Sequence, residues 1–279
     1  YYYGAICNQA NGSCTFTNIK GYAYVNASVN IKPNSSIGGL IGAVAGSINE
    51  DKTINFATIK FKDIENITLV FTGDEGGSSI VESNIGGLIG LASNSNIYVE
   101  NDILEKGVKV TVNSVKSFNV GGLIGKLDGA TLNNKDVSNN AISETPTSLT
   151  IDTESATGKS YYGGIVGYAN NSTIQYVSAR CKVENPYDRE YLISKTYYGG
   201  MVGRLENSTI SNCKNEFNAP VHQMKSNGDK TINSGKSFKY GYFSTWEIAG
   251  GSSYLIGNVG EICRELINSK ISEVETTQT

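Results

Sequence analysis

Residues 197–213 read YYGGMVGRLENSTISNC, and residues 161–177 read YYGGIVGYANNSTIQYV. The two segments start 36 residues apart and share a tyrosine pair, a Gly-Gly-apolar-apolar-Gly cluster and an Asn-Ser-Thr-Ile turn. Self-similarity at such a period is the sequence signature of a solenoid or another repeat architecture. The repeated segment therefore predicts a repeated structural unit.

The glycine cluster recurs along most of the chain. Five clear copies start 48, 35, 42 and 36 residues apart, at Gly38, Gly86, Gly121, Gly163 and Gly199. Degenerate copies open and close the chain, as GAICN from Gly4 and as SYLIGNVG from Ser253, 54 residues after Gly199. We interpret the shortest intervals as the bare unit. The longer ones carry insertions, which could form lateral loops that bind a partner, at 49–84, 133–160 and 218–252.

Each glycine cluster is followed by a short polar turn and a stretch of alternating residues. In GYAYVNASVNIK, residues 21–32, one face carries Ala23, Val25, Ala27, Val29 and Ile31. In GVKVTV, residues 107–112, Val108, Val110 and Val112 share one face. A period of two is typical of half-buried strands. Only EICRELINSKISEVE, from Glu261, could form a helix, so we divide the chain into a β-solenoid repeat domain (1–260) and a C-terminal cap or linker (261–279).

A single unit has one apolar face and too little of it to fold alone. Stacked copies bury a continuous core, and their strands pair in parallel about 4.8 Å apart. Glycines suit the corners, where φ is positive or two backbones approach closely. The sequence therefore predicts an all-β fold, a parallel β-helix (β-solenoid) of about six coils with loop insertions.

The pattern GG(L/I/M)(I/V)G, followed by a turn and by STIQYVSA or STISNC, resembles the GLUG motif. That motif repeats in large surface proteins of bacteria and protists, including filamentous-haemagglutinin-like adhesins and the non-catalytic part of some immunoglobulin A peptidases. The similarity is best over residues 160–217. It implies an extracellular β-helix used for reach, adhesion or assembly, and it implies no reaction.

Composition and charge exclude some classes of partner. The 279 residues carry a formal net charge of −3 and no dominant basic patch, so we expect no nucleic-acid partner. The longest apolar run, residues 37–48, is too short to span a bilayer, so we expect no membrane insertion in this segment.

Residues that carry out catalysis or bind metal are sparse. The single histidine, His222, cannot build a zinc site alone, and we interpret it as a surface-loop residue. The acids Asp51, Asp63, Asp74 and Glu75 are scattered through the insertions rather than aligned on strands. The turn GDEGG, residues 73–77, could hold calcium, but it lacks the usual ladder of acidic ligands. We therefore expect no enzyme activity, no cofactor and no metal.

The five cysteines are Cys7, Cys14, Cys181, Cys213 and Cys263. Cys7 and Cys14 are close enough in sequence to form a disulfide across a turn. Cys213 aligns with Val177 in the repeat, which predicts a core position, and Cys181 lies too far along its own coil to reach Cys213. Cys14 and Cys263 each follow the start of a terminal copy by ten residues, so head-to-tail stacking of two chains could bring them together.

Tyrosine pairs precede several glycine clusters, and stacking would align Tyr161 with Tyr197 and Tyr162 with Tyr198. These aromatics could fix the register by stacking on one another, or could form a surface strip that contacts a sugar ligand.

Seven Asn-x-Ser/Thr sequons are present, of which the adjacent Asn170 and Asn171 cannot both carry a glycan. The candidate glycosylation sites are Asn11, Asn26, Asn34, Asn66, Asn171 and Asn207. They are plausible glycan sites in a eukaryotic secreted protein and turn residues in a bacterial one.

Together these features predict an extracellular structural or adhesive module at the cell surface. It would be part of a large surface protein or the subunit of a fibre. Its partner would be a cell-surface or matrix component, including a glycan, and head-to-tail self-assembly is a further expectation. Two alternatives remain: a carbohydrate-active β-helix enzyme, and the non-catalytic repeat region of a large secreted peptidase.

Overall fold

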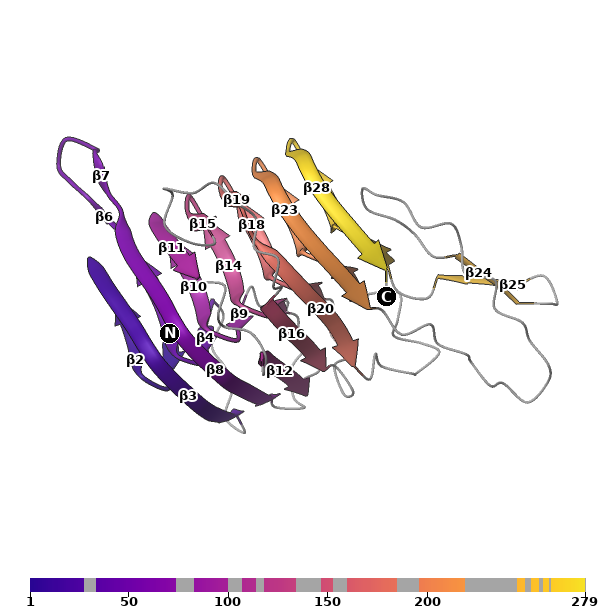
Figure 1. The fold of residues 1–279 in the computed structure, drawn as a ribbon, viewed down its shortest axis with the longest axis horizontal. Coiled ribbons are helices and arrows are strands. Elements are labelled where there is room, and N and C mark those ends of the chain that lie inside the picture. Colours follow the sequence, from indigo (N-terminus) through magenta and orange to yellow (C-terminus); the bar gives the residue numbers. More distant parts are fainter. Residues whose placement is uncertain are drawn as a thin grey trace.

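The computed structural model describes residues 1–27, 34–73, 83–99, 107–113, 118–133, 147–152, 160–184, 196–218, 245–248, 252–255, 258–260 and 262–278. Within these ranges every regular element is a β-strand. The strands lie side by side along one axis, with the first coil at one end of the stack and the last coil at the other (Figure 1).

The chain passes through three parallel sheets in each turn, and seven turns stack into a parallel β-helix. We call the sheets A, B and C. Sheet A contains, in spatial order, β1 (Tyr2–Gly4), β4 (Ser36–Gly38), β9 (Ser83–Gly86), β13 (Phe118–Gly121), β17 (Ser160–Gly163), β21 (Thr196–Gly199) and β26 (Asn258–Gly260). Sheet B contains β2 (Cys7–Ala10), β5 (Ile41–Ala45), β10 (Ile89–Ser93), β14 (Ile124–Asp128), β18 (Val166–Asn170), β22 (Val202–Glu206) and β27 (Cys263–Ile267).

Sheet C is formed by longer strands, some of them interrupted. It contains β3 (Ser13–Ala27), β8 (Ala57–Gly73), β11 (Ser95–Val99), β12 (Val108–Asn113), β15 (Thr131–Asn133), β16 (Thr147–Asp152), β19 (Thr173–Gln175), β20 (Ser178–Glu184), β23 (Thr209–Asn218) and β28 (Lys270–Gln278). Two antiparallel pairs complete the structure: β6 (Ser47–Ile48) with β7 (Ile54–Asn55), and β24 (Thr245–Ile248) with β25 (Ser252–Leu255).

The glycine cluster forms the corner between sheets A and B. Close approach of two backbones explains the third glycine of each cluster. A Cβ on Gly125 would lie 2.6 Å from the Gly90 carbonyl oxygen and 2.6 Å from the Ile85 nitrogen, both in the neighbouring coil. The corner therefore accepts no side chain at this position.

Aligned apolar columns fill the interior. The column Ile37, Ile85 and Val120 runs through sheet A with exposed fractions of 0%. The expected alternation is confirmed over residues 107–112, because Val108, Val110 and Val112 are buried. In residues 21–32, Ala23 is buried beside the exposed Tyr22, and the side chains from residue 24 onward lie outside the described part of the chain.

The corner between sheets B and C is formed by residues in the left-handed region of φ. Asn94, Gly129, Asn171, Asn207 and Asn268 have φ between 45° and 62° and occupy successive coils. The following residue is serine in most coils, and these serines link the coils. The Ser208 hydroxyl accepts a hydrogen bond from the Ser172 amide at 2.9 Å. In the same way, the Ser269 hydroxyl accepts a hydrogen bond from the Ser208 amide at 3.0 Å.

A second left-handed corner bends sheet C, and its position changes along the stack. In the first two coils it lies at Asn18 and Asp63, and in the last three at Tyr176, Asn212 and Glu273. In the first two coils the corner residue follows the aligned first column of sheet C by five residues, and in the last three coils it follows that column by three. The column consists of Ser13, Thr58, Thr173, Thr209 and Lys270 in these five coils.

The structure corrects the prediction at the C-terminal end. The segment after Glu261 forms β27 and β28, which extend sheets B and C, and is not a helix. The last glycine cluster starts at Gly260 rather than at Ser253, because Gly260 pairs with Gly199, the first glycine of the preceding cluster. The segment SYLIG, residues 253–257, has a similar spacing of small and apolar residues, and only the strand pairing distinguishes the two. With both terminal copies counted, the coils number seven.

Candidate interaction surface

A row of polar and aromatic side chains runs along the outer face of sheet B. Lys126, Tyr168, Arg204 and Glu265 align in one column, and Asp128, Asn170 and Glu206 align in the next. Alternation along the strands places both columns opposite the buried Leu127, Ala169 and Leu205. We call these seven residues the sheet B ladder.

The ladder is held together across coils. Lys126 Nζ and the Arg204 guanidinium each lie 5.1 Å from the centre of the Tyr168 ring, and they come from the coils on either side of it. The Tyr168 hydroxyl donates to Glu206 Oε2 at 2.6 Å, and Arg204 bridges Glu206 at 2.9 Å and Glu265 at 3.4 Å. Cations, carboxylates and an aromatic ring therefore converge on one face of four adjacent coils.

These contacts change how the groups titrate. Burial, and then the hydrogen bond to Glu206, raise the pKa of Tyr168 well above its usual value. The same hydrogen bond, with help from Arg204, lowers the pKa of Glu206. At neutral pH the ladder thus contains a neutral phenol that donates to an ionised carboxylate.

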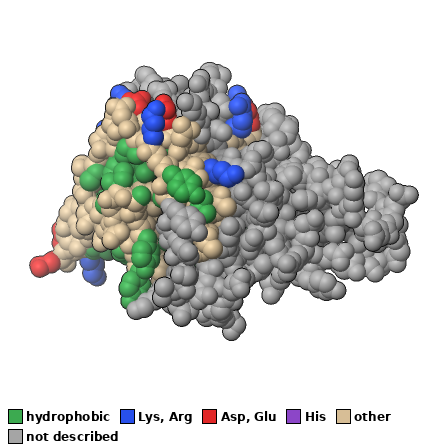
Figure 2. Space-filling model, turned by 90° about the horizontal axis from the view of Figure 1, so that it is seen from below, with side chains coloured by type: hydrophobic (Ala, Val, Ile, Leu, Met, Phe, Trp, Pro, Cys, Tyr) green, Lys and Arg blue, Asp and Glu red, His purple; other side chains and the backbone are tan. Residues whose placement is uncertain are grey.

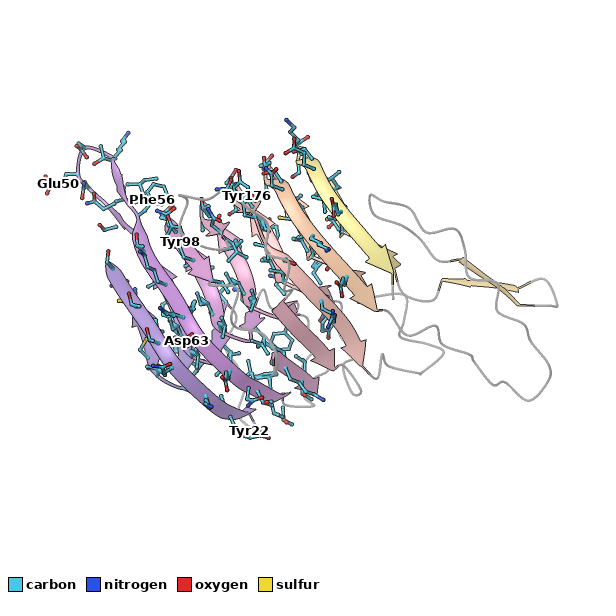
Figure 3. All side chains as sticks on the ribbon, viewed as in Figure 1. Tyr22, Glu50, Phe56, Asp63, Tyr98 and Tyr176 are labelled. Atoms are coloured by element: carbon cyan, nitrogen blue, oxygen red, sulfur yellow. The ribbon has the colours of Figure 1, made fainter. Side chains whose placement is uncertain are left out.

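The hairpin β6–β7 is the second conspicuous feature of the surface. It projects beyond the ends of the neighbouring strands, with Glu50 at its far end and Phe56 where it joins β8 (Figure 1, Figure 3). Gly46 aligns with Asn94 and Ala57 with Ser95, so residues 47–56 are inserted into a B–C corner without shifting the register. Without them the corner would read Gly46-Ala57-Thr58, matching Gly129-Ala130-Thr131 in the coil two steps along.

The hairpin is amphipathic and its tip is internally hydrogen-bonded. On one face, Asn49 donates to Thr53 Oγ1 at 2.8 Å and accepts from Asn55 at 2.8 Å, and the Thr53 amide donates to Asp51 at 3.0 Å. The other face carries Ile48 and Ile54, which are 64% and 42% exposed, and Phe56, which is 47% exposed. An apolar surface on a rigid arm is a typical feature of binding elements.

Apolar side chains also gather near the N-terminal end of the stack. Figure 2 views the molecule from below and shows these patches on the described part of that face, with charged side chains toward its margin. The large exposed apolar residues of the first coil are Tyr1, Tyr2, Tyr3, Ile6 and Tyr22.

The structure places the predicted tyrosines in register. Tyr161 aligns with Tyr197, and Tyr162 with Tyr198, in neighbouring strands of sheet A. Tyr162 is only 1% exposed and belongs to the core, whereas Tyr161 lies 5.7 Å from the Arg204 guanidinium. Alternation thus separates the two members of a pair, so Tyr162 packs in the core and cannot join a surface strip.

The cysteines form no disulfide in the described part of the chain. Cys7 and Cys14 are half-buried thiols. Cys213 is buried, as its alignment with Val177 predicted, and Cys181 is buried in the neighbouring strand. The expected shared column of Cys14 and Cys263 is wrong: Cys14 pairs with Ile59 in sheet C, whereas Cys263 lies in the sheet B column that begins at Cys7. The misplaced terminal glycine cluster caused this error.

The candidate glycosylation sites lie mostly on the surface. Asn11, Asn34, Asn66, Asn171 and Asn207 are exposed, and Asn26 lies in β3. Asn171 and Asn207 occupy the same left-handed corner as Asn94 and Asn268, which are not part of sequons. Backbone geometry thus already accounts for asparagine at these two positions, and their glycosylation stays a prediction.

Residues considered for catalysis or metal binding do not converge. Asp51 caps the hairpin tip, Asp63 forms the sheet C corner, and His222, Asp74 and Glu75 lie outside the described residues. Over the described ranges, no group of three or more histidine, cysteine or acidic side chains is arranged to hold a metal ion. That same part of the chain includes no helix long and apolar enough to cross a membrane.

Sequence reasoning missed the sheet B ladder, because aligned members of the ladder lie 36 to 61 residues apart in the sequence and only the strand register brings them together.

Comparisons with known proteins give no match to a family model, to a curated protein or to a solved structure.

Proposed function

We propose that this chain is an extracellular structural or adhesive β-solenoid module, belonging to a large cell-surface protein or to a fibre. The hairpin β6–β7 carries the proposal. It is inserted into a corner that the coil can close without it, and its apolar face contributes nothing to the solenoid core. The GLUG-like repeat supports a surface location, and the exposed sequons fit a secreted chain.

The partner we propose is a cell-surface or matrix component that packs against Ile48, Ile54 and Phe56. The stacked coils act as a rigid support, and the hydrogen-bonded tip holds the arm in one conformation, so that little conformational entropy is lost on binding. Glycans are a second ligand class, for which the exposed side of Tyr161 and the sheet B ladder are suitable contacts.

Binding to a glycan array and to immobilised collagen, fibronectin and laminin tests the proposal. We expect the intact chain to bind at least one of them, and deletion of residues 47–56 to weaken that binding at least about tenfold. The variant Ile48→Thr/Ile54→Thr should weaken it comparably, whereas Glu50→Gln at the tip should not. Binding that survives the deletion, or an intact chain that binds nothing, would refute it.

The sheet B ladder favours one second candidate, a carbohydrate-active enzyme acting on acidic polysaccharides. Two cations could bind the sugar carboxylates, and Tyr168 beside Glu206 could transfer a proton. Incubation with polygalacturonate, alginate and hyaluronan would detect chain cleavage. Cleavage lost in Tyr168→Phe would support this function, and intact polymers would exclude it for these substrates.

A further inference from the structure

The outer faces of sheets A and B face each other across the glycine clusters. A Cβ on Gly167 of sheet B would lie 2.5 Å from the Val120 nitrogen of sheet A, and a Cβ on Gly203 would lie 3.0 Å from the Tyr161 Cβ. The Arg204 guanidinium, from sheet B, lies 5.7 Å from the centre of the Tyr161 ring, from sheet A. Because outward groups of both sheets converge, the corner between them is concave on its outside.

We call one part of this concave corner the A–B groove, the part between Tyr161 on sheet A and Lys126, Tyr168 and Arg204 on sheet B. Nearer the N-terminus the same corner is buried. Ser36 and Ala43 are 0% and 2% exposed, and Asn84 is 5% exposed and donates to Ser36 Oγ at 3.2 Å. In the A–B groove the side chains are larger and partly exposed, at 20% for Lys126 and 29% for Arg204. The accessible part of the corner therefore lies over the fourth and later coils.

Hydrogen-bond donors and acceptors alternate along the groove, and their charges nearly cancel. Lys126 Nζ lies 3.6 Å from Asp128, and Arg204 bridges Glu206 and Glu265. Two cations thus stand against three carboxylates, and each cation already has an acidic neighbour. A site for an anion concentrates positive charge, so this arrangement favours a ligand that carries no charge and whose own groups both donate and accept.

Sugar hydroxyls have both properties, and an aromatic ring completes the site. Tyr168 is contacted by a cation from the coil on either side, so its ring faces are occupied. Tyr161 is half-buried and is contacted by Arg204, which orients its ring on the opposite wall of the groove. Aromatic side chains combine apolar ring faces with a polar edge, which suits the C–H faces and hydroxyl rims of sugar rings.

The direction of the groove limits the shape of the ligand. The ladder from Lys126 to Glu265 crosses four strands of sheet B, which is three strand spacings or about 14 Å. The groove runs across the strands, along the axis of the stack. An extended chain of about three sugar units, each about as long as one strand spacing, would contact the whole ladder.

We propose that the A–B groove binds an uncharged polysaccharide, held extended along the axis of the stack. The proposal rests on the glycan-binding part of the proposed function and names its ligand class. Tyr161 packs against a sugar ring, the carboxylates of the ladder accept from its hydroxyl groups, and Lys126 and Arg204 donate to them.

Isothermal titration calorimetry of the 279-residue chain tests this assignment. The uncharged probes are glucomannan, xyloglucan, a β-1,3-glucan and glycol chitin, and the acidic probes are polygalacturonate and alginate. We expect at least one uncharged polymer to bind, with a dissociation constant that changes less than about twofold between about 0.05 and 0.5 M salt. Oligosaccharides of that polymer should gain affinity up to about three or four units and then level off, because the ladder spans about 14 Å.

Tyrosine variants locate the binding site. Tyr161→Ala should weaken binding at least about tenfold, whereas Tyr161→Phe keeps the ring and should stay within about threefold of the native affinity. Tyr98→Ala is the matched control, because Tyr98 is also a half-buried tyrosine beside a cation, Lys60 at 5.8 Å, but lies on sheet C. It should leave the affinity unchanged. Circular dichroism melts would show that the three variants remain folded.

Three results would overturn the proposal: no binding to any uncharged polymer, tighter binding to polygalacturonate or alginate than to every uncharged polymer, or equal losses in Tyr161→Ala and Tyr98→Ala. The hairpin β6–β7 is judged separately, by binding to collagen, fibronectin or laminin. Tyr161→Ala should leave that binding unchanged, so each proposal can fail while the other stands.

Discussion

At the scale of single residues, two different physical reasons fix the backbone at the corners. The glycine clusters between sheets A and B leave no room for a Cβ, whereas the B–C and sheet C corners require positive φ. Asparagine is favoured over other residues with side chains in the left-handed region, and most of these corners use it.

The first prediction concerns the third glycine of a cluster. Gly125→Ala would drive a Cβ into two backbone atoms of the adjacent coil, at 2.6 Å each, so the strands must separate. We expect a loss of at least about 3 kcal/mol in unfolding free energy, measured by urea denaturation. Gly21→Ala is the matched control: its Cβ would meet only Ile67 Cδ1, at 3.8 Å, and stability should change by less than about 1 kcal/mol. Similar costs for the two changes would contradict the close-packing explanation.

A second prediction uses the corner of sheet C. Tyr176 has φ of 56°, and its neighbour in the next coil, Asn212, has φ of 51°. Because a bulky residue in this region carries strain, Tyr176→Asn should stabilise the protein by about 1 kcal/mol. The reverse exchange, Asn212→Tyr, should destabilise it by a similar amount. Thermal melts of both variants would check the sign, and a destabilised Tyr176→Asn would show that packing of the ring outweighs the strain.

At the scale of elements, the sheet B ladder links four neighbouring strands, and two of its groups, Tyr168 and Glu206, titrate at opposite ends of the pH range. The folded state raises the pKa of Tyr168, so its contribution to stability is complete below about pH 10, the usual pKa of tyrosine, and is lost as pH rises further. The folded state lowers the pKa of Glu206, so its contribution is complete above the usual pKa of about 4 and is lost on acidification.

Comparison with Tyr168→Phe isolates this pair. We expect the variant to lose about 1 kcal/mol at pH 7, because Glu206 loses a hydrogen-bond donor. The difference between the two proteins should shrink above pH 10, where Tyr168 begins to ionise in the unfolded wild-type chain, and also below pH 4. Unfolding free energies from pH 3 to pH 11 would show both limbs. A difference that stays constant across the range would mean that the hydrogen bond does not contribute.

The sequence predicted the elements well where a residue pattern alone sets the structure. Alternation in residues 107–112 and the five clear glycine clusters gave strands, corners and parallel stacking. The terminal cluster was misplaced because the copy was started at Ser253, where SYLIG resembles the glycine cluster, whereas the strand register places Gly260 beside Gly199. The ladder could not be predicted, because Tyr168, Arg204 and Glu265 become neighbours only when the coils are aligned.

At the scale of the whole molecule, burial separates the cysteines into those inside the stack and those at its end. Burial raises the pKa of Cys213 to about 12, and also raises that of Cys181, so both thiols stay protonated at neutral pH. Cys7 and Cys14 are half-buried in β2 and β3 of the first coil.

Native alkylation with iodoacetamide, read by mass spectrometry, should therefore label Cys7 and Cys14 first, and Cys181, Cys213 and Cys263 only after unfolding. Rapid native labelling of Cys181 or Cys213 would mean that the central coils open, contrary to a uniformly stacked core.

The inserted hairpin is a separable arm, whose position along the stack depends only on which B–C corner carries it. Residues 47–56 sit between Gly46 and Ala57, and the same Gly-Ala-Thr corner recurs at Gly129 and Ala130, two coils further along. Moving the insertion there would shift the arm by two strand spacings, about 10 Å, without altering the coil beneath it. Stacked coils of this kind let an interaction arm be repositioned in fixed steps, so that the spacing between binding elements can be changed by transplanting ten residues rather than by redesigning a fold.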